Sequence, residues 1–309
     1  MLPTFYILGA QKAGTTWLAA MLRQHPDIFI PRQKELHFFN DEARYARGPA
    51  WYARQFAGAH AARAIGEATP NYLAINTPKA QRVSERIRAL TPDATFIVAL
   101  RNPVSRALSA MFHAARKRRI PFWTNFDRAL QDILSHHVDP SDVLSIGRYD
   151  VQLESYFRSF PRERFHILVY EEDIVKRKAE TLDNLWQFLG VGAPPLLRHQ
   201  TRLFNVGIKS RLGLAFAQLL PWKWGVAMAR TVEHAGLGRQ ITLSEETTAA
   251  LFAYYEKTRG RVEALIGRDL SCWRVRPQTS GCTAASANPF GSPKHQVEAA
   301  RAKATVAPR

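Results

Sequence analysis

The stretch that decides the fold is Phe5–Leu18, with the sequence FYILGAQKAGTTWL. Its uninterrupted apolar start predicts a buried strand, and a turn bounded by Gly9 and Gly14 follows. Thr15 and Thr16 then open an amphipathic segment, which predicts a helix. The N-terminus of such a helix directs unpaired N–H groups and the positive end of the helix dipole at a ligand. We therefore expect this strand–loop–helix unit to bind a phosphorylated ligand.

The lysine of this loop does not stand where a Walker-type phosphate loop has it. In that motif the lysine directly follows the second glycine. Here Thr15 occupies that place, and the lysine is Lys12, inside the loop. The best second strand, Phe96–Leu100, ends in Arg101, whereas an ATP-dependent kinase needs a carboxylate for Mg²⁺. These features predict a phosphate site without a metal and leave a P-loop kinase as the alternative enzyme.

Three segments resemble, in the same order, motifs of the sulfotransferases that use 3′-phosphoadenylyl sulfate (PAPS). Gln11–Thr16 is similar to their 5′-phosphosulfate loop. Arg101–Ser109 is similar to their 3′-phosphate motif, in which an arginine ends a strand and a serine follows in the next helix. Lys34–Phe39, KELHFF, resembles the branch that acts on carbohydrates, including the heparan sulfate enzymes. The donor-binding residues that the resemblance implies are Gln11, Lys12, Ala13, Gly14, Thr15, Thr16, Arg101 and Ser109.

The resemblance implies transfer of the sulfuryl group of PAPS to a hydroxyl or amine of a carbohydrate or glycolipid, with release of adenosine 3′,5′-bisphosphate (PAP). Lys12 would neutralise the leaving phosphate oxygen, and Glu35 would take the acceptor proton as the catalytic base. His37 is the competing base, because imidazole is the usual proton acceptor near neutral pH. Histidine serves as the base in the branch that sulfates phenols and steroids, so that alternative would make small phenols or alcohols the acceptors.

Four residues are expected to contact the substrates: Lys34, His37, Glu67 and Tyr149. Lys34 stands beside Glu35 and would contact PAPS or its sulfate. Glu67–Tyr72, EATPNY, resembles a Glu-Lys-Ser-Pro-x-Tyr segment of the carbohydrate branch, although the lysine of that pattern is Ala68 here. No second catalytic lysine is therefore expected in this segment. Tyr149 follows a family-like Gly-Arg pair and would line the donor or acceptor cleft.

Strands and helices alternate along the chain, which is typical of a doubly wound parallel sheet. We expect an α/β, P-loop-like three-layer fold over residues 1–275, with ligands at the carboxyl ends of the strands. Residues 211–230 are apolar, aromatic and basic and predict a helical pair packed on the core, with a membrane-surface segment or a cover over the acceptor cleft as alternatives. Residues 276–309 are rich in Ala, Ser and Pro and predict a disordered basic tail. The expected strands are 4–8, 28–30, 64–67, 96–100 and 165–169, and the other expected helices are 15–24, 78–90, 103–118, 175–189 and 244–266.

Composition bounds the class of protein. The chain has 309 residues, of which 46% are hydrophobic, enough for the core of one large domain. No run approaches the roughly 18 uncharged apolar residues of a membrane span. The first strand begins within three residues of Met1, which leaves no room for a signal peptide, and two cysteines, Cys272 and Cys282, imply no disulfide framework. These features predict a cytoplasmic protein.

The formal net charge of +17 favours anionic ligands, although solvated Lys and Arg faces explain it equally well. The densest cationic run is Arg116–Arg119. An acidic acceptor is one candidate partner, and peripheral association with an anionic membrane is another. A nucleic-acid-binding module would explain the charge but not a buried strand feeding a phosphate loop, so no specific nucleic acid is expected. The oligomeric state is left open.

Overall fold

The computed structural model describes residues 1–73, 77–194 and 207–274. Within these ranges five parallel strands form one sheet in the order β2-β3-β1-β4-β5. The central strand β1 pairs with β3 on one side and with β4 on the other, and all of its residues are buried. Burial on both faces explains the continuous apolar sequence of these strands. The strands are β1 (Phe5–Gly9), β2 (Ile28–Phe29), β3 (Ala64–Ala68), β4 (Thr95–Leu100) and β5 (Phe165–Val169).

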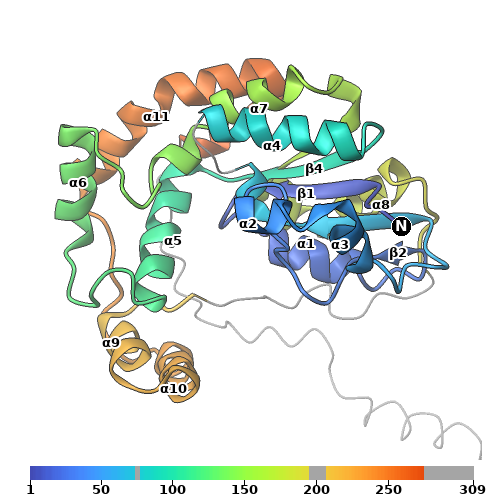
Figure 1. The fold of residues 1–309 in the computed structure, drawn as a ribbon. Coiled ribbons are helices and arrows are strands. Elements are labelled where there is room, and N and C mark those ends of the chain that lie inside the picture. The colour runs from blue at the N-terminus through green and yellow to red at the C-terminus, as the bar shows by residue number, and fades with distance from the viewer. Residues whose placement is uncertain (74–76, 195–206, 275–309) are drawn as a thin grey trace, which may run out of the picture. The chain divides into compact units, whose positions relative to one another are not determined.

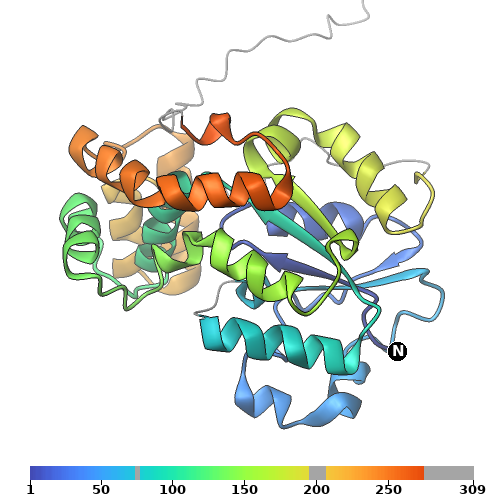
Figure 2. The same ribbon diagram turned by 90° about the horizontal axis from the view of Figure 1, so that it is seen from above.

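Helices cover both faces of the sheet, which confirms the three-layer α/β fold. Figures 1 and 2 show α4 (Thr77–Leu90), α7 (Tyr149–Phe157) and α11 (Glu245–Ile266) on one face and α1 (Thr15–Leu22) on the other. The ring of His25, just after α1, lies 6.1 Å from that of Trp186 in α8 (Lys178–Phe188). The strand order reverses at β1, so a ligand site is expected at the carboxyl ends of β1 and β4.

Two predicted helices have clear boundary signals. Before α5 (Pro103–Arg116), the side chain of Asn102 accepts hydrogen bonds from the N–H groups of Val104 and Ser105. Ser244 caps α11 in the same way, and Gly267 ends it with a φ of 65°. The helix expected at 175–189 begins only at Lys178, because a π-helix (Tyr170–Lys176) precedes it. There the Asp173 carboxylate accepts a hydrogen bond from the Val169 N–H, which favours this wide turn over a regular α-helix.

The predicted helical pair is present as α9 (Arg211–Leu219) and α10 (Trp222–His234). It projects beyond the end of α5 in Figure 1, where α9 packs against α5 and Ala229 of α10 joins the same hydrophobic cluster. Among the described helices, none is both long enough and apolar enough to span a bilayer. The predicted tail and Cys282 lie outside the described residues, so the domain boundary near residue 275 stays a prediction. Helices that the sequence did not predict are α2 (Glu42–Tyr45), α3 (Gly48–Arg54), α6 (Phe126–His136) and α7.

Candidate active site

The loop between β1 and α1 has the backbone geometry expected of an anion site. Gly9 has a φ of +152°, and a Cβ there would lie 2.8 Å from the carbonyl oxygen of Pro70. Gly14 has a φ of +88°, and a Cβ would lie 3.2 Å from the ring of Tyr170. Both positions therefore require glycine. Because α1 begins at Thr15, the N–H groups of its first turn have no acceptor within the helix.

Lys12 lies in the middle of this loop, where cations from other segments surround it. Burial is the largest cause that lowers the pKa of Lys12, to about 8, and the charges of Arg116, Arg101 and Lys34 lower it further. Glu35 acts in the opposite direction. The fold therefore gathers a cationic cluster from four separate segments, and an anion placed among these groups would relieve their mutual repulsion.

Arg101 follows β4 and is tied directly to the loop. Its Nη1 donates a hydrogen bond of 3.0 Å to the carbonyl oxygen of Lys12, and its guanidinium lies 4.9 Å from the centroid of the Tyr170 ring. Its Nε is enclosed and has no hydrogen-bond partner among the described residues. An enclosed arginine donor without a partner is costly, and an anion would satisfy it. Ser109 lies two turns into the helix that follows Arg101 and is partly exposed.

Lys34, Glu35 and His37 lie together on an irregular segment beside β3. Lys34 Nζ donates a hydrogen bond of 2.6 Å to Glu35 Oε1, and His37 Nε2 lies 3.9 Å from Glu35 Oε2. The N–H of Glu35 donates to the carbonyl of Ala68 at the end of β3. Glu35 and His37 have φ values of 67° and 54°, which non-glycine residues rarely adopt. Such backbone strain is frequent at functional sites.

The protonation states of Glu35 and His37 differ. Burial raises the pKa of Glu35, but the hydrogen bond and charge of Lys34 outweigh it and hold that pKa below its usual value. The carboxylate is 43% exposed, so it is both ionised at neutral pH and accessible. Burial lowers the pKa of His37, which leaves the imidazole neutral near pH 7. Both residues are therefore in a form that can accept a proton.

Glu67, which the sequence predicts to contact a substrate, is enclosed in the structure. Its side chain is 1% exposed, and its carboxylate accepts hydrogen bonds from the hydroxyl groups of Tyr52, Thr69 and Tyr72. The Thr69 and Tyr72 hydroxyls in turn accept hydrogen bonds from the N–H groups of His37 and Phe39, at 3.5 and 3.4 Å. Burial raises the pKa of Glu67 to about 7, although the three donors oppose it. Glu67 is therefore enclosed beneath the Lys34–Phe39 segment and holds its backbone.

Tyr149 is also enclosed. Its hydroxyl donates a hydrogen bond of 3.0 Å to the carbonyl oxygen of Arg101, and its ring lies 5.8 Å from that of Trp273. Both Glu67 and Tyr149 are buried, and their polar groups are bonded inside the fold, so their expected contacts with the substrates stay a prediction. Tyr149 bonds to the backbone of Arg101, and Glu67 is linked through Thr69 and Tyr72 to the Lys34–Phe39 segment.

The structure brings two further residues to the site that the sequence analysis did not single out for it. His113 and Arg116 lie one and two turns after Ser109 in α5, on the same side of the helix. Burial and then the charge of Lys12 lower the pKa of His113 to about 4, and the charge of Arg116 is felt at both Lys12 and His113. The i, i+4, i+7 spacing from Ser109 is a signal that could have found them. The cationic run at residues 116–119 concealed it, because such a run is usually solvated.

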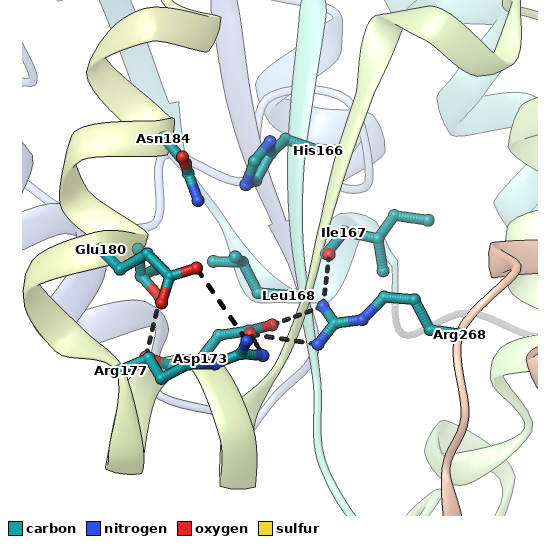
Figure 3. A pocket seen from close by; sticks show the side chains of 9 residues that line it. His166, Ile167, Leu168, Asp173, Arg177, Glu180, Asn184 and Arg268 are labelled. Atoms are coloured by element: carbon teal, nitrogen blue, oxygen red, sulfur yellow. Dashed lines mark hydrogen bonds and ion pairs between the residues drawn. The ribbon is translucent and has the colours of Figure 1, made fainter.

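One polar pocket lies away from this site (Figure 3). Its volume is about 270 Å³, and it is lined by residues of β5, the π-helix with the residue after it, α8 and the segment after α11. The Asp173 carboxylate pairs with Arg268 at 2.6 Å and with Arg177 at 2.9 Å. Glu180 lies 4.0 Å from Arg177, so two carboxylates balance the two arginines of this pocket. His166 stands at the start of β5, opposite to the strand ends that carry the loop. We assign this pocket to the structural framework.

Comparison with known proteins agrees with the loop and strand ends described above. Residues 2–203 match the model of the sulfotransferase domain family. The chain is 35% identical over 193 residues to heparan sulfate glucosamine 3-O-sulfotransferase 6 of Homo sapiens. The aligned region covers 61% of this chain and 52% of that protein. It is 40% identical over 111 residues to the membrane-associated sulfotransferase kil1 of Dictyostelium discoideum. That aligned region covers 35% of this chain and 22% of that protein. The chain therefore spans about half the length of the heparan sulfate relative.

The cytoplasmic location predicted from the sequence is wrong. The relatives are heparan sulfate enzymes and a sulfotransferase that is named as membrane-associated. This overturns an inference drawn from Met1 and the two cysteines. The start of a chain and a low cysteine content do not determine where a protein works.

A solved structure has the same fold. The sulfotransferase of Alicyclobacillus acidocaldarius superposes with a TM-score of 0.66 at 28% identity, over 89% of this chain and 100% of that chain. This likeness confirms the expected P-loop-like architecture, and the family match confirms the resemblance that the three sequence motifs carry. With the family model matching well over half of its length, the chain belongs to the sulfotransferase domain family.

Proposed function

We propose that this protein transfers the sulfuryl group of PAPS to a hydroxyl or amine of an acceptor and releases PAP. The observation that carries the proposal is Arg101, which is bonded to the phosphate-loop backbone and keeps an enclosed donor without a partner among the described residues. Family membership supports the reaction class. The ionised and accessible Glu35 supplies a base near the same cationic cluster.

The residues of the loop fit the donor. The backbone N–H groups and hydroxyls of Thr15 and Thr16, together with Lys12 and the loop from Gln11 to Gly14, would hold the 5′-phosphosulfate. Arg101 and Ser109 would hold the 3′-phosphate, because a guanidinium binds phosphate through two parallel donors. PAPS supplies a sulfuryl group on a phosphate oxygen that becomes a stable leaving group.

The proposed step moves one proton and one sulfuryl group. Glu35 accepts the proton of the acceptor as the acceptor oxygen or nitrogen forms its bond to sulfur. The bond between sulfur and the phosphate oxygen breaks, and its electron pair leaves with PAP. Lys12 neutralises the charge that grows on that oxygen. Lys34 keeps Glu35 ionised before the acceptor arrives.

We propose a carbohydrate as the acceptor, in free or lipid-linked form. The similarity of the chain to a heparan sulfate glucosamine enzyme and the Lys34–Phe39 segment support this choice. Lys12, Lys34 and Arg116 also give the site a field that attracts an acidic saccharide. One observation favours a second candidate, a small phenol or alcohol: His37 is neutral near pH 7 and close to Glu35, so it is able to act as the base.

PAP is expected to bind at least about tenfold more tightly than AMP, because only PAP offers a 3′-phosphate to Arg101 and a charged hydrogen bond is worth about 1.5–3 kcal/mol. Calorimetry with each nucleotide, with and without EDTA, measures the difference, which EDTA should not change. The affinity for PAP should fall as the pH rises above about 8, where Lys12 loses its proton. Arg101→Gln should abolish the preference, and equal affinities in the unmodified protein would refute the Arg101 and Ser109 assignment.

We also propose that Glu67 positions the base segment. When Glu67 is ionised, all three hydroxyls donate to it, which leaves the Thr69 and Tyr72 oxygens free to accept the N–H groups of His37 and Phe39. When it is protonated, one of these hydroxyls must turn and accept from the carboxylic acid instead. We therefore expect the segment to be best ordered when the carboxylate is ionised.

Turnover is accordingly expected to rise with pH through about 7, the pKa of Glu67. Glu67→Gln should lower kcat by about ten- to a hundredfold, because small misplacements of a catalytic group are costly, and should remove this pH dependence. The affinity for PAP should be unchanged. Tyr52→Phe is the matched control, since it removes a hydroxyl that donates to Glu67 but keeps the ring that packs on Phe38 and Phe39, and its pH dependence should persist. A Glu67→Gln protein with normal kcat and an unchanged profile would exclude the positioning role.

A further inference from the structure

The helical pair α9–α10, which we call the hairpin (residues 211–234), carries a concentration of exposed apolar side chains. Trp224 is 75% exposed and Leu219 is 71% exposed, the two highest values among the large apolar side chains of the described residues. Trp222, Leu212 and Met228 are exposed on the same two helices. Trp224 and Met228 are one turn apart and share a side of α10. Such clustering is unusual for a free protein surface, where exposed apolar residues are scattered.

The hairpin is attached to the rest of the fold through close packing and side-chain hydrogen bonds. Gly225 lets α10 approach α9 closely, since a Cβ there would lie 2.5 Å from the carbonyl oxygen of Phe216. Arg118, just after α5, donates hydrogen bonds to the carbonyls of Ala217 and Leu220, and Gln218 bonds back to the chain near the end of α5. Figure 1 shows the pair standing out from the end of α5. Its outer side is therefore presented on a fixed support.

The charges around these apolar groups are almost all positive. Glu233 is the single carboxylate in the described stretch 207–240, and it is bonded to the backbone N–H and hydroxyl of Ser210. Lys117 lies 5.1 Å from the centroid of the Trp222 ring. Lys223 and Arg230 are two turns apart on another side of α10 from Trp224. The cations of this stretch are Lys209, Arg211, Lys223, Arg230 and Arg239.

We propose that the hairpin docks the protein on an anionic lipid surface. Trp224, Leu219 and Met228 enter the boundary between headgroups and acyl chains, and Lys223 and Arg230 contact lipid phosphates. An amphipathic helix with Trp and aliphatic groups on one side and cations on the other is the arrangement that binds in the plane of such an interface. This inference goes beyond the proposed reaction and does not depend on it.

Other occupants fit the surface less well. An acidic glycan would satisfy the cations and stack on the Trp rings, but it would gain nothing from Leu219 and Met228. A second copy of the chain would place cations against cations, because a two-fold contact repeats the same patch on both sides. Lipid satisfies the apolar and the cationic groups together.

The full chain should float with vesicles of phosphatidylcholine mixed with phosphatidylglycerol and should not float with phosphatidylcholine alone. Added salt should release it, because contacts between exposed cations and lipid phosphates are screened. If the protein does not float with the anionic vesicles, the proposal is overturned. Sulfuryl transfer to a soluble acceptor, measured in parallel, separates this outcome from a failure of the proposed function.

Two variants locate the surface on the hairpin. Leu219→Ser combined with Trp224→Ser removes apolar contact, and Lys223→Glu combined with Arg230→Glu reverses the charge. Each should lower vesicle affinity at least about tenfold. Val138→Ser and Arg88→Glu, at exposed positions on other parts of the surface, are matched controls and should bind as the unmodified protein does. Undiminished binding by the hairpin variants, or light scattering that shows them dissociating a dimer, would contradict lipid docking.

Discussion

Lys12→Ala is expected to lower turnover by a factor of about 10²–10³ and to weaken PAP binding far less. Arg101 donates a hydrogen bond to the carbonyl oxygen of Lys12. This bond fixes the part of the loop backbone that carries the Lys12 side chain. Its charge matters most while the bond to sulfur breaks and further negative charge grows on the phosphate oxygen in the transition state. The loss of PAP affinity is expected to be the smaller one that also follows when Lys12 loses its proton above about pH 8. Steady-state kcat together with calorimetric PAP affinity separates the two effects.

The control for this variant is Lys176→Ala. Lys176 is an exposed lysine, 64% accessible, that pairs with Glu172 in the π-helix, and its loss should leave turnover and PAP affinity unchanged. If the Lys12 variant keeps near-normal turnover, Lys12 is a binding residue only, and charge neutralisation must come from another cation of the cluster.

Glu35→Gln is expected to reduce transfer to a saccharide by roughly 10²-fold or more, with PAP affinity preserved. Glutamine keeps the shape and hydrogen bonding of the side chain but cannot take the proton of a sugar hydroxyl. That hydroxyl is a poor nucleophile until a base removes its proton in the transition state. Lys34 loses its ion-pair partner in this variant, which adds a free cation near the donor site and does not weaken PAP binding.

His37→Gln and a panel of acceptors complete this experiment. The histidine variant should retain most of its transfer rate, and small phenols should be poor acceptors compared with saccharides. A Glu35→Gln protein of normal rate beside an inactive His37→Gln protein assigns the base to His37 instead. A clear preference for phenols contradicts the carbohydrate proposal in the same way.

The sequence predicts the donor loop well because its determinants are local. Gly9 and Gly14 stand where the backbone turns, and an apolar strand and a helix flank them. The strand–loop–helix unit can therefore be predicted from this stretch alone, without the segments that pack on it. The buried parallel strands are readable for the same reason, since each is a short continuous apolar run.

The features that the sequence does not reveal depend on packing between distant segments. Glu67 and Tyr149 are polar residues of motif-like segments, and nothing local shows that their partners Tyr52 and Arg101 enclose them. His113 and Arg116 join the site only because α5 presents one side to the loop. The π-helix at 170–176 is stabilised by the hydrogen bond from the Val169 N–H to the Asp173 carboxylate. Helix propensities of single residues do not predict such a contact.

The strand order has one consequence for how this scaffold changes during evolution. The groups proposed for the donor stand at the ends of β1 and β4, whereas the base segment is anchored on the opposite neighbour of β1, through the bond from Glu35 to Ala68 of β3. The two tasks are therefore anchored on opposite sides of the central strand, although Lys34 and Glu35 lie close enough for their charges to act on Lys12. Substitutions in the segment around Glu35 are therefore expected to change acceptor selectivity more than nucleotide affinity, which would let one donor site be combined with different acceptors.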